Sequence, residues 1–149
     1  MTVGALLESL DRMLPADARP EMSATSSARL AIEARGVTHD SRQVAPGWIF
    51  VALRGLKTDG AQFIPQAVAN GAAAAVAEGA PPGDVDVPWM AVKDARLALA
   101  LLAAEFYGHP SRRMQLVGIT GTNGKTTTSY VLSAMFEAAG IRCGLMGKV

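Results

Sequence analysis

The chain has 149 residues, half of them hydrophobic and 18% charged, and its 14 basic and 13 acidic side chains give a formal net charge of +1. This much apolar material supports a packed core and excludes a disordered chain, while the near-neutral charge argues against partners such as nucleic acid or an anionic membrane. A single cysteine excludes a disulfide framework and a cysteine-rich metal site.

The N-terminal segment predicts a helix and a soluble, cytoplasmic protein. Apolar residues recur at helical spacing over residues 3–14, and a proline ends the predicted helix. Glu8 and Asp11 interrupt this segment, whereas a signal peptide needs an unbroken apolar stretch. The longest apolar run, residues 97–104, is too short to span a bilayer.

Residues 15–110 alternate short apolar runs with helical patterns, as expected of a small α/β domain. The polar stretch 15–29 is expected to be a loop. Apolar runs rich in β-forming residues predict strands, and capping residues mark the helices between them. The expected strands are 48–53, 72–78 and 89–92, and the expected helices are 61–70, which closes at Gly71, and a longer one from the N-cap Asp94 to about Tyr107.

A second α/β unit is expected after a short polar bridge at residues 111–113. Residues 115–120 form an apolar run that predicts a strand, and a glycine-rich loop, an amphipathic helix and a further predicted strand at 141–146 follow. Strand, helix and strand in this order make a βαβ unit of a parallel sheet. One such unit cannot cover both faces of a parallel sheet. We therefore expect domains at 1–110 and 111–149, the second incomplete, in the N-terminal part of a longer protein.

The glycine-rich loop carries the clearest chemical signal. Glycines let backbone N–H groups approach phosphate oxygens, and a helix N-terminus favours an anion. Lys125 can reach the terminal phosphates, and the Thr126 hydroxyl is placed to ligate Mg²⁺. The general phosphate-loop pattern has glycine where Ile119 stands, and the alternative is a glycine-rich turn that begins a helix and binds nothing. The expected ATP-binding residues are Gly121, Thr122, Asn123, Gly124, Lys125, Thr126 and Thr127.

Residues 117–128, V-G-I-T-G-T-N-G-K-T-T-T, resemble the ATP-binding loop of the Mur ligases, the ATP-dependent amino-acid ligases of peptidoglycan synthesis. That family uses the shifted glycine spacing, which accounts for Ile119. The loop alone would also suit folylpolyglutamate synthase or cyanophycin synthetase. Residues 40–55, the Asp-Gly pair at 59–60 and residues 63–72 are similar to the N-terminal UDP-binding domain of the MurE branch.

The resemblance implies the fold, the reaction and the ligands. It implies an α/β fold, in which a small N-terminal UDP-binding domain precedes the first βαβ unit of a parallel-sheet ATPase domain. It further implies a cytoplasmic, monomeric enzyme with ATP and Mg²⁺ as cofactors and Lys125 as the catalytic residue. The reaction would add a third amino acid to UDP-MurNAc-L-Ala-D-Glu through an acyl phosphate. The expected amino acid is meso-diaminopimelate, with L-lysine as the alternative. The residues implied to contact UDP are His39, Ser41, Leu56, Lys57 and Thr58.

Alternatives stay open for both the function and single residues. One alternative is a MurF-type or other phosphate-loop amide ligase, which shares the loop. The alternative outside the enzymes is a non-catalytic nucleotide-binding fragment. For Asp40 and Arg42, the alternative to a contact with the nucleotide-sugar is a structural ion pair that holds a turn. Lys148 departs from the family, where a Gly-Thr pair usually follows the last strand.

Overall fold

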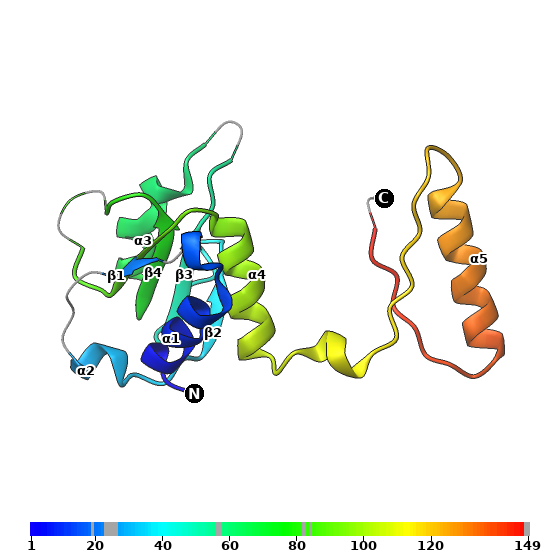
Figure 1. The fold of residues 1–149 in the computed structure, drawn as a ribbon, viewed down its shortest axis with the longest axis horizontal. Coiled ribbons are helices and arrows are strands. Elements are labelled where there is room, and N and C mark those ends of the chain that lie inside the picture. The colour runs from blue at the N-terminus through cyan, green and yellow to red at the C-terminus, as the bar shows by residue number, and fades with distance from the viewer. Residues whose placement is uncertain (19, 23–26, 56–57, 82, 84, 148–149) are drawn as a thin grey trace. The chain divides into compact units, whose positions relative to one another are not determined.

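The computed structural model describes residues 1–18, 20–22, 27–55, 58–81, 83 and 85–147. The chain divides into two compact units, Met1–Pro110 and Ser111–Val149. The first unit contains a five-stranded sheet with helices, and the second contains one long helix with an extended segment before it and another after it (Figure 1).

The sheet of the first unit is mostly parallel. Its order is β1-β5-β4-β3-β2, in which β2 to β5 are parallel neighbours and β1 pairs antiparallel with β5. The strands are β1 (Glu21–Met22), β2 (Gly36–Thr38), β3 (Trp48–Ala52), β4 (Ala74–Glu78) and β5 (Trp89–Val92). The three predicted strands are confirmed as β3, β4 and β5, and the α/β class with them. The short edge strands β1 and β2 were not predicted. The expected loop at 15–29 is interrupted by β1, by the 3₁₀ turn Ala16–Ala18 and by the start of α2 (Ser27–Leu30).

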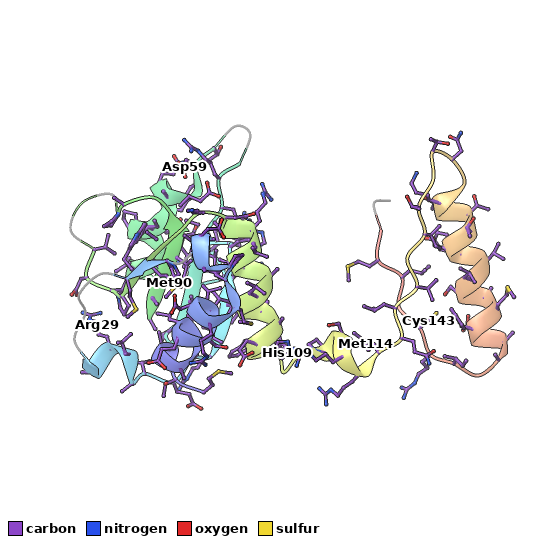
Figure 2. The ribbon with its side chains drawn as sticks, in the orientation of Figure 1. Arg29, Asp59, Met90, His109, Met114 and Cys143 are labelled. Atoms are coloured by element: carbon purple, nitrogen blue, oxygen red, sulfur yellow. The ribbon has the colours of Figure 1, made fainter. Side chains whose placement is uncertain are left out.

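Helices cover both faces of this sheet, because alternate residues of each strand point to opposite sides. Ile49 and Val51 of β3 pack with α1 (Val3–Met13) and α4 (Ala95–Phe106), whereas Phe50 and Ala52 pack with α3 (Ile64–Ala69). Met90, labelled in Figure 2, belongs to the core on the α1 and α4 side. The remaining short elements of this unit are the 3₁₀ turns Ala16–Ala18 and Gly60–Phe63 and the helix α2 (Ser27–Leu30).

Local sequence signals place the helix ends. The Asp94 carboxylate accepts hydrogen bonds from the backbone N–H groups of Arg96 and Leu97, both at 2.9 Å, so it caps α4 as predicted. Gly71 follows α3 with φ +95°, a left-handed conformation that suits glycine. The predicted helices 3–14, 61–70 and 94–107 are confirmed within these ends.

The second unit differs from the expected βαβ arrangement. A 3₁₀ turn (Pro110–Arg113) leads into it, and α5 (Lys125–Ala138) forms where a helix was predicted. Residues 115–120 and 141–146 are extended, but they are not assigned as strands in the part of the chain that the structure describes. A strand is defined by its ladder of hydrogen bonds to a neighbour, so an apolar, extended segment without that ladder is not yet a strand.

Candidate functional site

The glycine-rich loop forms an open cradle at the start of α5. Gly121 and Gly124 have φ +144° and +75°, both in the range that favours glycine, and Gly124 is the N-cap of the helix. The first helical hydrogen bond runs from the Thr128 N–H to the Gly124 carbonyl oxygen at 2.9 Å. The N–H groups of residues 125–127 therefore precede the helical ladder and are oriented for an anion. All residues of the loop are exposed.

Lys125 lies across its own loop. Its ammonium group donates to the backbone carbonyl oxygens of Gly121 and Thr122, the latter at 3.5 Å. These contacts place the ammonium group at the mouth of the loop, where it can meet a phosphate. Thr126 follows in the first turn of α5 and is exposed, as a residue that ligates Mg²⁺ must be. The loop geometry thus fits a nucleoside triphosphate with its metal ion.

A second candidate region lies at the end of β2 in the first unit. His39 is exposed at the carboxyl end of this strand, and Asp40 and Arg42 form an ion pair with a 2.7 Å contact. The Arg42 side chain and backbone N–H both donate to the Asp40 carboxylate, which lowers the pKa of Asp40 from 3.8 to about 2. The hydrogen bond between the two side chains also raises the pKa of Arg42. The structure thus confirms the ion pair between Asp40 and Arg42 that was the structural alternative for these residues.

Ser41 is held more firmly than the sequence suggested. Its side chain is buried, its hydroxyl donates to Gln66 Oε1 at 2.9 Å, and its carbonyl oxygen accepts from Asn70 Nδ2 at 2.9 Å. Sequence reasoning missed Gln66 and Asn70 as part of this region, because they lie 25 and 29 residues further along the chain. The weak signal that could have pointed to them is a pair of amides four residues apart on one short helix.

The loop after β3 is the other segment implied to contact UDP. The Gly55 N–H donates to the Thr58 carbonyl oxygen at 2.9 Å. At the base of the loop the Arg54 guanidinium lies 3.9 Å from the carboxylate of Asp59, which is labelled in Figure 2. Thr58 is exposed, whereas Leu56 and Lys57 lie outside the described residues, as does Lys148. Because β2 and β3 are parallel neighbours, the loops that follow them both leave the sheet at the carboxyl ends of its strands. Ligands of open α/β sheets bind outside these carboxyl ends.

The described residues also limit the kind of site that they can form. They contain no group of three or more histidine, cysteine, aspartate or glutamate side chains that could hold a metal ion. A magnesium ion held by one threonine hydroxyl, phosphate oxygens and water does not need such a group. None of the helices formed by these residues has the length and apolar character to cross a membrane.

Curated relatives share the sequence of both units. The UDP-N-acetylmuramyl-tripeptide synthetase of Roseiflexus sp. (strain RS-1) is 58% identical over 118 residues, which are 78% of this chain and 23% of that protein. The UDP-N-acetylmuramoyl-L-alanyl-D-glutamate–2,6-diaminopimelate ligase of Solibacter usitatus (strain Ellin6076) is 41% identical over 149 residues, all of this chain and 28% of that protein. The chain thus spans about a quarter of the length of the relatives it matches.

Solved structures and a family model agree with these relatives. A UDP-N-acetylmuramoyl-L-alanyl-D-glutamate–2,6-diaminopimelate ligase matches 99% of this chain and 28% of its own, with a TM-score of 0.65 and 28% identity. MurF from Acinetobacter baumannii matches 92% of this chain and 28% of its own, with a TM-score of 0.63 and 26% identity. The sequence model described as "Mur ligase family, catalytic domain" matches residues 33–107, just over half of the chain. The chain therefore belongs to the Mur ligase family.

Proposed function

We propose that the protein is an ATP-dependent amide-bond ligase of peptidoglycan synthesis, which adds the third amino acid to UDP-MurNAc-L-Ala-D-Glu. The observation that carries this proposal is the exposed loop 121–127, with two left-handed glycines and a lysine at the N-terminus of α5. The names of the curated relatives, which are 58% and 41% identical to this chain, support the tripeptide reaction over a MurF-type one. The name of the Solibacter usitatus relative also favours diaminopimelate, which we take as the meso form, over L-lysine as the added amino acid.

In this proposal the residues of the second unit bind and orient ATP. ATP, when bound, supplies the phosphoryl group that activates the D-Glu carboxylate as an acyl phosphate. The N–H groups that precede the helical ladder cradle phosphate oxygens, and the Thr126 hydroxyl ligates Mg²⁺. The Lys125 ammonium neutralises charge that develops on the transferred group, which makes it the catalytic residue of this chain.

The first unit binds the nucleotide-sugar in the same proposal. His39 and Thr58 are exposed on the two loops that leave one edge of the sheet, and Ser41, Leu56 and Lys57 complete the proposed UDP contacts. The domains are then a substrate-binding domain at 1–110 and the beginning of an ATP-binding domain at 111–149. The enzyme acts in the cytoplasm as a monomer, with ATP and Mg²⁺ as cofactors.

Nucleotide titrations of the 149-residue chain test the two assignments separately. An isotope-labelled sample is titrated with UDP and, in a second series, with ATP and Mg²⁺, and amide shifts are followed by NMR. We expect UDP to shift residues near His39, Ser41 and Thr58, and ATP to shift residues 121–128. Lys125→Ala should weaken ATP binding about 10- to 100-fold, because it removes a charge-assisted hydrogen bond worth about 1.5–3 kcal/mol, and should leave UDP binding unchanged.

Arg142→Ala is the matched control, since it removes an exposed positive charge from the same unit without touching the loop. UDP shifts confined to residues 121–127 would mean that the first unit is not the UDP site. Ligase activity is measured on the complete gene product as phosphate release with UDP-MurNAc-L-Ala-D-Glu and meso-diaminopimelate. Near-normal turnover by Lys125→Ala there would refute the proposed function.

A further inference from the structure

The loop that follows β2 is fastened to the rest of the first unit at Ser41. The hydrogen bonds of Asp40 stay local, because they join it to Thr38, Arg42 and Gln43. The bonds of Ser41 instead reach α3 and its C-cap: its hydroxyl donates to Gln66 in the helix, and its carbonyl oxygen accepts from Asn70, the residue that follows the helix. Local bonds shape a loop, whereas bonds to a distant helix fix where the loop lies.

Different residues at α3 pack in the core and form the hydrogen bonds to Ser41. Ile64 and Ala67 are buried and pack in the core, whereas Gln66 and Asn70 are exposed at the residue level. Asn70 is the C-cap of α3, four positions after Gln66, so the two amides lie on the same face, one helical turn apart. One amide accepts from the side chain of Ser41 and the other donates to its backbone, which constrains the position and the rotation of that residue.

We propose that Gln66 and Asn70 are positioning residues for nucleotide binding, which hold Ser41 and the loop 39–42 in the conformation that receives the uridine diphosphate. This inference rests on the proposed function of the first unit, and it assigns to α3 a role that its packing does not require. The Ser41 hydroxyl gives its proton to Gln66, so the lone pairs of its oxygen are what Ser41 offers to a nucleotide.

Substitutions of the two amides in the 149-residue chain test the inference by NMR titration with UDP. Gln66→Leu keeps the bulk of the side chain and removes the acceptor, and Asn70→Ala removes the donor. We expect each to weaken UDP binding about three- to tenfold, the effect of one neutral hydrogen bond. Gln115→Leu, the same change at an exposed residue of the second unit, is the matched control and should bind like the parent chain.

A double-mutant cycle separates positioning from a general structural effect. Because Gln66 contacts the Ser41 hydroxyl, Gln66→Leu should add nothing to the weakening caused by Ser41→Ala. Asn70→Ala should still weaken the Ser41→Ala variant, because Asn70 contacts the backbone carbonyl. Gln66→Glu restores an acceptor oxygen and should recover binding of uridine, which carries no phosphate to repel the new carboxylate.

The outcomes distinguish this inference from the proposed function. A parent chain that fails to bind UDP overturns both. A parent chain that binds UDP, with Gln66→Leu and Asn70→Ala equally tight, overturns the positioning role and leaves the proposed function standing. Additive effects of Gln66→Leu and Ser41→Ala also overturn it. Tryptophan fluorescence reports whether each variant folds, and if Gln66→Leu does not, Asn70→Ala and Gln66→Glu decide.

Discussion

Asp40 and Arg42 give a residue-level test that does not depend on any ligand. Arg42 donates three hydrogen bonds to the Asp40 carboxylate, which lower its pKa from 3.8 to about 2. A carboxyl group whose pKa is lower in the folded state stabilises the fold above its unfolded pKa, and this contribution is lost as the pH falls through the folded value. The window for Asp40 therefore lies between about pH 4 and pH 2.

We expect Arg42→Gln to move the titration midpoint of Asp40 upward, toward the ordinary value. Carbon NMR of the Asp40 carboxyl group against pH measures it directly. Arg29→Gln is the control, since Arg29 pairs with Asp86 and not with Asp40. An Asp40 midpoint that stays the same in Arg42→Gln would show that the ion pair is not the cause of the low pKa.

At the scale of elements, the N-cap of α4 makes a quantitative prediction. Asp94→Ala removes two hydrogen bonds to the first turn of this helix and should lower the free energy of unfolding by about 0.5–2 kcal/mol. Urea unfolding followed by tryptophan fluorescence measures it, because Trp48 and Trp89 both lie in the first unit. Asp11→Ala is the control: an acid in the last turn of α1 opposes the helix dipole, so its removal should not destabilise. Equal losses in the two variants would contradict the capping role.

The accuracy of sequence reasoning also differs by element. The helices α1, α4 and α5 and the strands of four or five residues were predictable, since each carries its own periodicity, cap or apolar run. The four-residue helix α2 was not, and it begins inside the expected loop at 15–29. The edge strands β1 and β2 were not, because two or three residues are too few for a pattern and pairing alone defines them. The glycine-rich loop was predictable because its residues are consecutive. The bonds from Gln66 and Asn70 to Ser41 were not, because only the fold brings these residues together.

At the scale of the whole molecule, we expect the two units to differ in stability. The buried hydrophobic residues of the described chain all lie in the first unit, whereas Leu116, Val117 and Met135 of the second are 73%, 61% and 62% exposed. Residues 1–110 should therefore fold on their own, and residues 111–149 should exchange amide hydrogens much faster. Hydrogen exchange followed by mass spectrometry compares the units in one sample. Equal protection across both would place the domain boundary elsewhere.

The short edges of the sheet have a consequence for synthesis on the ribosome. Residues 1–110 emerge before residues 111–149, so the first unit can fold while the chain that follows is still being made. An exposed strand edge is then a template for pairing with other nascent chains. Here β1 and β2 present only two and three residues at the two edges, whereas the interior strands have four or five. The sheet therefore offers a neighbouring nascent chain few backbone groups for strand pairing, which limits aggregation of the first unit during synthesis.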